Sequence, residues 1–190
     1  IRREGVVMIV GLSGYARSGK DSVAEILVND YGFTRLAFAD AIRDMLYDMD
    51  VIVACSPTGR IAGLVDLVGW DKAKETNEVR RLLQNLGVAA RTRVGENIWI
   101  QAVLHKMRPQ SNYVITDVRF KNEADAIQAF EGHMWRVTRP FVFPVNDHIS
   151  EIDLDDYNDF DFHLHNDKGL KELKDTVEFL IQEMRHGLQG

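Results

Sequence analysis

The sequence has a single cysteine, Cys55, among 190 residues, which excludes an internal disulfide and a cysteine-based metal cluster. Such sparing use of cysteine is typical of a reducing compartment, so we expect a cytoplasmic protein in which Cys55 is an inert structural residue. No stretch approaches the roughly 18 consecutive apolar residues that a membrane-spanning helix requires. We therefore expect no membrane partner.

The chain also has fewer positive than negative side chains. It contains 23 Lys and Arg residues and 29 Asp and Glu residues, which gives a formal net charge of -6. A surface that binds duplex nucleic acid needs a basic stripe that displaces counterions, so we expect no nucleic-acid partner. A small anionic ligand in a local basic pocket remains compatible with this balance. The length predicts one domain, residues 1–190, that is elaborated by insertions.

What the sequence does contain is a phosphate-binding motif near its start. A run of mostly β-branched apolar residues from Val6 leads into the segment G-Y-A-R-S-G-K-D-S and then into an amphipathic run, which predicts a strand, a loop and a helix. Gly14 and Gly19 bracket four residues and precede Lys20, so successive backbone N–H groups can point into one concavity in front of the helix. Polyphosphate is the ligand that such a concavity binds.

The residues predicted to bind the nucleotide phosphates are Gly14, Tyr15, Ala16, Arg17, Ser18, Gly19, Lys20, Asp21 and Ser22. Lys20 would reach the β- and γ-phosphates, and the next hydroxyl would bind magnesium. Asp21 occupies the usual hydroxyl position and Ser22 follows it, so both are predicted metal ligands. Asp21 would hold magnesium through water or favour the helix N-terminus, where an anion is stabilised by about 0.3 to 1 kcal/mol. The alternative is an ordinary glycine-rich turn between a strand and a helix.

Hydrophobic periodicity predicts further strands and helices along the rest of the chain. Further strands are expected at residues 33–38, 113–116, 133–137 and 160–165. Helices are expected after the phosphate loop, from residue 39, near 61–68, from 76, from about 97 to 109, at 121–130 and at 170–184. Residues 140–148 contain two prolines and no periodicity, which is typical of a mobile or ligand-covering loop, and residues 149–157 are strongly acidic.

Charged residues on two of the helices are candidates for binding a second substrate. Asp40 and Arg43 lie three residues apart, and they either form a local ion pair or direct the arginine toward a ligand near the strand ends. Arg80, Gln84 and Arg91 fall close to one stripe of a helix, because eleven residues make about three turns. Two guanidinium groups and an amide aligned in this way either read a base with its phosphate or belong to a solvated face.

Strand ends supply the remaining candidates. Asp117 follows an apolar strand, where a second carboxylate that organises magnesium belongs in a phosphate-loop fold. Arg136 and Arg139 bracket the exit of the next strand. These residues carry little information alone, and the phosphate-binding motif makes them more informative.

Taken in order, several stretches make the chain resemble the bacteriophage deoxynucleoside monophosphate kinase family. They are G-Y-A-R-S-G-K-D-S at 14–22, F-A-D-A-I-R at 38–43, R-R-L-L-Q-N-L-G at 80–87, Y-V-I-T-D-V-R-F-K-N-E at 113–123, V-T-R-P at 137–140, H-I-S-E at 148–151 and N-D-K-G-L-K-E-L from 166. The resemblance spans nearly the whole chain, and an aspartate after the lysine is similar to that family's loop. The departure is Lys168, inserted where the family usually reads N-D-G, which leaves open whether this turn holds the nucleotide base.

The resemblance implies a three-layer α/β fold of the P-loop NTPase type, with five parallel strands in the order 2-3-1-4-5 and helices on both faces. It implies a phosphotransferase that uses ATP and magnesium to phosphorylate a deoxynucleoside 5′-monophosphate, in the host cytoplasm if a phage encodes it. Insertions around residues 51–110 and 139–158 would bind the substrate or form a lid. The oligomeric state stays open, with a homodimer as one alternative.

The resemblance also implies roles for the candidate residues. Lys20 is the main electrostatic stabiliser, Asp117 organises metal-bound water or the acceptor phosphate, and Arg136 or Arg139 contacts the transferring phosphoryl group as a lid arginine. The residues expected to bind the acceptor are Asp40, Arg43, Arg80, Arg81, Gln84 and Arg119. Arg80 and Arg81 point about 100° apart on a helix, and only Arg80 shares the Gln84 stripe.

Other functions remain open. Another small-molecule kinase of the same fold, of the dephospho-coenzyme A or phosphomevalonate type, differs in its acceptor, and assays across acceptors distinguish it. A nucleotide-hydrolysing switch or motor is a more distant class, but the chain has no N-K-x-D base-reading motif and its acidic balance argues against a nucleic-acid motor. A catalytically inactive homologue would bind phosphate without transferring it.

Overall fold

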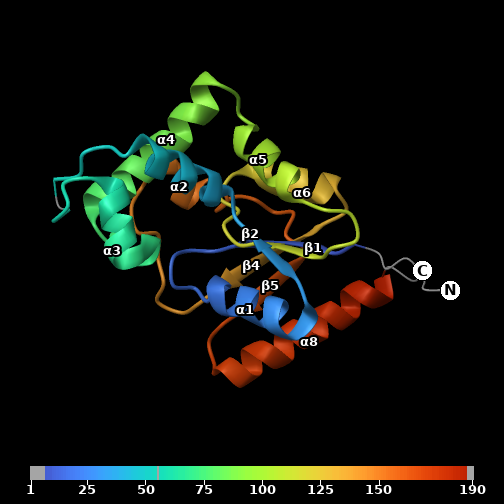
Figure 1. Ribbon diagram of the computed structural model, residues 1–190. Helices are drawn as coiled ribbons and strands as arrows, with labels where there is room; N and C mark the ends of the chain where they lie inside the picture. The colour runs from blue at the N-terminus through green and yellow to red at the C-terminus, as the bar shows by residue number, and fades with distance from the viewer. Residues whose placement is uncertain (1–6, 55, 188–190) are drawn as a thin grey trace. The chain divides into compact units, whose positions relative to one another are not determined.

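The computed structural model describes residues 7–54 and 56–187, so Cys55 and the prediction made for it lie outside the described residues. Backbone contacts divide the chain into two compact units. The sheet unit comprises Ile1–Ala37 and His105–Gly190, and the helical unit comprises Phe38–Leu104. The colours of Figure 1 follow the chain through both units.

Five parallel strands form the centre of the sheet unit. In chain order they are β1 (Ile9–Ser13), β2 (Thr34–Leu36), β3 (Tyr113–Ile115), β4 (His133–Thr138) and β5 (Phe162–His165). Their order across the sheet is β2-β3-β1-β4-β5, which confirms the predicted order 2-3-1-4-5 and the α/β fold class. Because β1 lies between β3 and β4, the loop that follows it begins at the centre of the carboxyl edge of the sheet.

Helices cover both faces of this sheet, as Figure 1 shows. On one face, α1 (Lys20–Tyr31) packs against α8 (Leu170–Gly187). On the other face, α6 (Lys121–Ala129) packs against β1 and β4, and α7 (Ile149–Ile152) is a single turn elsewhere in the unit.

The alternation of side chains along β1 explains this arrangement, because successive residues of a strand point to opposite faces. The core on the α1 and α8 face includes Val10, Leu12, Val23, Leu27, Val114, Trp135, Val137, Leu164, Leu173, Val177 and Ile181. On the α6 face, a Cβ on Gly11 would lie 2.5 Å from Met134 Sδ and 2.7 Å from Ile127 Cδ1. The glycine therefore allows α6 to pack directly onto β1.

The helical unit contains α2 (Phe38–Met49), α3 (Ile61–Ala73), α4 (Asn77–Arg93) and most of α5 (Ile98–Lys106). Its core consists of Leu46, Val53, Ile61, Leu64, Ala73 and Val79. Thr76 caps α4, as predicted, because its hydroxyl accepts a hydrogen bond from Val79 N at 3.4 Å. Trp99 is buried, and its indole N–H donates to the Gly87 carbonyl at 3.0 Å, so this side chain packs α5 against α4.

The predicted elements are present, and their boundaries differ. The second strand ends at Leu36 instead of residue 38, because Phe38 already begins α2. The first strand begins at Ile9, later than the apolar run suggests, and Val6 lies outside the described residues. In α3 the chain leaves helical geometry at Gly69, with a φ of 75°, where the predicted helix 61–68 ends, and a second helical piece then continues to Ala73. The short helix α7 was not predicted.

The packing of β5 gives a test of the sheet unit. Leu164 on β5 is fully buried, whereas Leu170 at the start of α8 is 67% exposed. Leu164→Ala should lower the free energy of unfolding by about 2 to 5 kcal/mol, because it removes buried methyl groups and leaves a cavity. Leu170→Ala is the matched control and should change it by no more than about 0.5 kcal/mol. Denaturant unfolding measures both, and equal losses would contradict the burial of β5.

Candidate active site

The loop between β1 and α1 has an unusual backbone. The φ angle is 142° at Gly14, 67° at Arg17 and 108° at Gly19, and such positive values favour glycine. A Cβ on Gly14 would lie 2.2 Å from the carbonyl oxygen of Val137 on β4. The loop therefore lies directly against β4, and this geometry explains the glycine at position 14.

Helix α1 begins at Lys20 without a side-chain cap, because its N-cap residue is Gly19. The first N–H groups of a helix have no partner within the helix, and they carry the partial positive charge of the helix dipole. Asp21 in the first turn is exposed, and Ser22 beside it is half-buried. The start of α1 can therefore bind an anion through its backbone.

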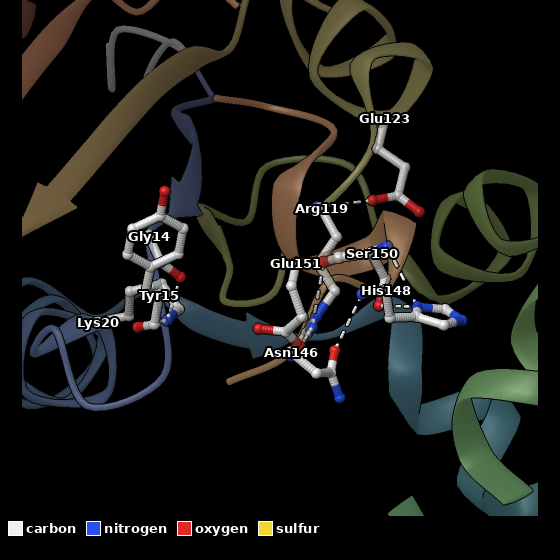
Figure 2. A network of polar contacts seen from close by, with 9 residues as sticks. All are labelled: Gly14, Tyr15, Lys20, Arg119, Glu123, Asn146, His148, Ser150 and Glu151. Carbon is white, nitrogen blue, oxygen red and sulfur yellow. Dashed lines mark hydrogen bonds and ion pairs between the residues drawn. The ribbon is translucent and has the colours of Figure 1, made fainter. Parts of the chain in front are cut away.

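The Lys20 side chain lies over the loop, as Figure 2 shows. Its Nζ donates hydrogen bonds to the carbonyl oxygens of Gly14 at 2.7 Å and Tyr15 at 2.8 Å. Burial, followed by the Arg119 cation, lowers the pKa of Lys20 to about 8. The carboxylates that act in the opposite direction are Asp21, Glu151 and Asp117. Since the neutral amine still has two N–H donors, both hydrogen bonds can persist after deprotonation.

A shallow, open hollow lies beside this loop, wholly within the sheet unit. Its lining residues are Ser13, Gly14, Tyr15, Lys20, Asp117, Val118, Arg119, Arg136, Ser150, Glu151 and Leu154. The hollow thus brings together the phosphate loop, the end of β3, the end of β4 and α7. Three of its side chains, Lys20, Arg119 and Arg136, are cations.

Arg136 on β4 is held from several sides. Its guanidinium donates to Ser13 Oγ at 3.0 Å and to Asp155 Oδ1 at 2.9 Å. It also lies over two rings, 5.3 Å from the centroid of Tyr15 and 5.5 Å from that of Phe160, where cation–π attraction adds to the contact. The side chain is only 13% exposed, so the charge has a fixed position beside the loop.

Two further predicted residues follow β3, and a third follows β4. Asp117 is half-buried, and the Arg119 guanidinium pairs with Glu151 and donates to the Ser150 carbonyl at 3.2 Å (Figure 2). The backbone N–H of Arg119 donates at 2.9 Å to a carboxylate oxygen of Glu123, which is buried at the start of α6. Arg139 comes directly after β4 and is exposed.

The acidic segment, residues 149–157, contributes side chains that the sequence analysis did not assign. Asp155 Oδ1 accepts hydrogen bonds from the Tyr15 hydroxyl at 2.8 Å and from Arg136 at 2.9 Å. Burial, and then the hydrogen bond to Asp155, raises the pKa of Tyr15. The sequence showed the acidic composition of the segment, whereas its partners depend on tertiary contacts.

The start of the acidic segment is fixed by a small hydrogen-bond network, drawn in Figure 2. His148 is the N-cap of α7, and its Nδ1 accepts from Ser150 N at 3.2 Å. Asn146 Oδ1 in turn accepts from His148 N at 3.1 Å. Because Glu151 follows within the same turn, this network sets the position of the carboxylate that pairs with Arg119.

The other predicted acceptor-binding residues lie in the helical unit. On α2, Asp40 and Arg43 form the local ion pair at 3.1 Å, and the Nε of Arg43 is buried without a hydrogen-bond partner among the described residues. On α4, Arg80 and Gln84 are half-buried and Arg81 is exposed.

Comparison with known proteins decides the family. Residues 60–177 match the sequence model of the deoxynucleotide monophosphate kinase family. The chain belongs to this family. It is also 27% identical over 193 residues to a protein of Acanthamoeba polyphaga mimivirus, provisionally named a deoxynucleotide monophosphate kinase, with 90% of this chain and 94% of that protein covered. The family confirms the resemblance seen in the sequence, and it makes the chain a nucleotide-using phosphotransferase.

Solved structures of other kinases are more distant. Dephospho-CoA kinase from Campylobacter jejuni is 16% identical with a TM-score of 0.49, over 94% of this chain and 98% of that one. Shikimate kinase from Aquifex aeolicus is 13% identical with a TM-score of 0.48, over 96% and 100% of the two chains. Likeness at this level carries no argument about the acceptor. No helix in the described part of this kinase is long and apolar enough to span a bilayer.

The first turn of α1 offers oxygen atoms of the type that magnesium binds. Within residues 7–54 and 56–187, no cluster of three or more His, Cys, Asp or Glu residues could hold a metal ion. Mg²⁺ usually keeps several waters and takes one or two protein oxygens together with substrate phosphates. Ser22 and Asp21, in the first turn of α1, carry side-chain oxygens, which are the ligands that magnesium prefers. They stay its predicted ligands.

The pKa of Lys20 gives a test at the nucleotide site. Bound polyphosphate should raise this pKa from about 8 toward its ordinary value of 10.5, because an anion favours the protonated amine. ADP binding should therefore take up a proton near about pH 8.5, and the affinity should fall as pH rises through the pKa of the free protein. Calorimetry in buffers of different ionisation enthalpy measures this uptake. Lys20→Arg stays charged throughout and should show none, so equal uptake by both proteins would contradict the assignment.

Proposed function

We propose that the chain transfers the γ-phosphoryl group of ATP to a deoxynucleoside 5′-monophosphate and releases ADP and the deoxynucleoside diphosphate. Membership of the deoxynucleotide monophosphate kinase family supports this acceptor class. The observation that carries the proposal is the hollow at the start of α1, which Lys20, Arg119 and Arg136 line together. Phosphoryl transfer needs positioning and charge neutralisation more than covalent chemistry by the protein, and these cations supply the charge.

On the donor side, we assign loop residues 14–22 to the ATP phosphates. Lys20 would exchange its hydrogen bonds to the Gly14 and Tyr15 carbonyls for bonds to phosphate oxygens. Magnesium, for which Ser22 and Asp21 are suitable ligands, would neutralise charge between the phosphates when bound. The N–H groups at the start of α1 can donate hydrogen bonds to an anion without rearrangement.

The arginines of the sheet unit would stabilise charge on the transferring group. Arg136 is already oriented by Ser13 and Asp155. Arg139 follows β4 and is exposed, so closure of its segment over the nucleotide would bring this arginine to the phosphates. Arg119 would leave Glu151 to contact a substrate phosphate. Asp117, close enough to influence Lys20 electrostatically, would organise metal-bound water or the acceptor phosphate.

We assign the acceptor to the helical unit, whose residues 38–104 cover most of the insertion predicted around 51–110. Arg43 and Arg80 would bind the acceptor phosphate, and Gln84 would bind the base. Asp40 would orient Arg43, because the two side chains already form an ion pair. The unpartnered Nε of Arg43 supports this role, since a buried donor without a partner is destabilising unless a ligand satisfies it.

The proposal is tested by the dependence of ATP turnover on the acceptor. ADP release should require a deoxynucleoside monophosphate, and ribonucleotides, dephospho-coenzyme A and phosphomevalonate serve as alternative acceptors in the same assay. Lys20→Ala should lower kcat by about 100-fold or more with the fold intact, because it removes the fixed cation nearest the phosphates. Lys174→Ala is the matched control, since this lysine is exposed and pairs with Asp30. Equal ADP release without an acceptor, or near-normal turnover by Lys20→Ala, would refute the proposal.

The acceptor assignment has its own test on α4. Arg80→Ala should raise the KM for the monophosphate by about tenfold or more, because it removes a charged hydrogen bond to the acceptor, and the KM for ATP should change little. Arg93→Ala is the control, since Arg93 lies on the same helix and is exposed. If Arg80→Ala changes both KM values equally in steady-state assays, Arg80 does not bind the acceptor.

A further inference from the structure

The turn between β5 and α8 contacts the phosphate loop, although 148 residues of sequence separate the two sites. The side-chain amide Nδ2 of Asn166 donates a hydrogen bond to the Ser18 carbonyl oxygen at 3.0 Å. A Cβ on Gly19 would lie 2.2 Å from the same Nδ2 atom. The Asn166 amide therefore fills the space in which any other residue at position 19 would place its side chain.

Asn166 is itself held by the sheet. Its backbone N–H donates to the Thr138 carbonyl at 2.8 Å, which continues the pairing of β4 with β5 beyond the Thr138 and His165 pair. The residue is half-buried. Its amide thus projects from a strand end whose backbone is fixed, and side chains on such rigid elements position a ligand site well.

The consequence for the loop follows from the geometry of the peptide bond. In a planar trans peptide, the C=O of one residue and the N–H of the next point in opposite directions. By binding the Ser18 carbonyl, Asn166 turns the Gly19 N–H away from itself. Gly19 is the N-cap of α1, so this N–H directly precedes those of the helix N-terminus.

We infer that Asn166 is a positioning residue for the donor nucleotide, because its amide fixes the Ser18–Gly19 peptide in the orientation that directs the Gly19 N–H at a phosphate. The inference rests on the proposed function, since it concerns the same ATP site. It gives the turn at 166–169 a role that does not involve the base. The inserted Lys168 does not prevent this contact, because the Asn166 hydrogen bonds are formed with Lys168 in place.

Two variants test this role. Asn166→Ala deletes the amide, and Asn166→Asp keeps its shape but faces the Ser18 carbonyl with an oxygen that cannot donate. Each should weaken ADP binding in the presence of magnesium by about tenfold or more, measured by titration calorimetry, and raise the KM for ATP to a similar degree. The KM for the monophosphate should change less than about twofold, and the thermal midpoint should shift by no more than about 4 °C.

Asn158→Ala is the matched control. Its Nδ2 also donates to a backbone carbonyl, that of Asp156 at 3.2 Å, but the residue is exposed and outside the hollow. It should bind ADP as the unaltered protein does. Unchanged ADP binding in both Asn166 variants would overturn the inference alone, and so would equal rises in both KM values with a large loss of thermal stability. An unaltered protein that neither binds ADP nor turns over ATP would overturn the proposed function as well.

Discussion

A loop that binds phosphate through its main chain must leave N–H groups free, so its shape has to be held through other atoms. In this protein the contacts that hold the loop involve its carbonyl oxygens and the Cα of a glycine. Lys20 binds the carbonyls of Gly14 and Tyr15, and Asn166 binds that of Ser18. The Cα of Gly14 lies close to a β4 carbonyl, where no side chain fits. Strand β4 and the turn between β5 and α8 thus hold the loop in place. The N–H groups at the start of α1 stay available to a ligand.

The cations around the loop are also held before any phosphate binds. Arg119 pairs with Glu151, and Arg136 donates to Asp155, both from the acidic segment 149–157. Under the proposed function, this arrangement lowers the entropy that the arginines would lose on binding, but substrate phosphates would have to compete with these carboxylates. The proposed affinity for the nucleotide would therefore reflect the difference between two sets of ionic contacts. Lys20 differs from the arginines, because the hydrogen-bond partners that it would leave are backbone carbonyls instead of carboxylates.

The features that could be predicted from the sequence are those fixed by neighbouring residues. Gly14, Gly19 and Lys20 belong to one short motif, and their backbone geometry follows from it. The strand order came from the family resemblance, and the strands alone would have left it open. The roles of Asp155 and Asn166 could not be predicted, since both residues contact the loop after β1, which is more than a hundred residues away in the sequence. Strand and helix boundaries shifted where one element follows another without a loop, as β2 and α2 do.

The central claim is that main-chain N–H groups at the start of α1 bind the phosphates of the donor nucleotide. A crystal structure of the protein with ADP and magnesium tests it most directly. The account predicts β-phosphate oxygens within hydrogen-bond distance of the N–H groups of Gly19 and Lys20, with the Lys20 amine moved from the loop carbonyls to the phosphate. Nucleotide bound elsewhere, with Lys20 still on the Gly14 and Tyr15 carbonyls, would contradict it.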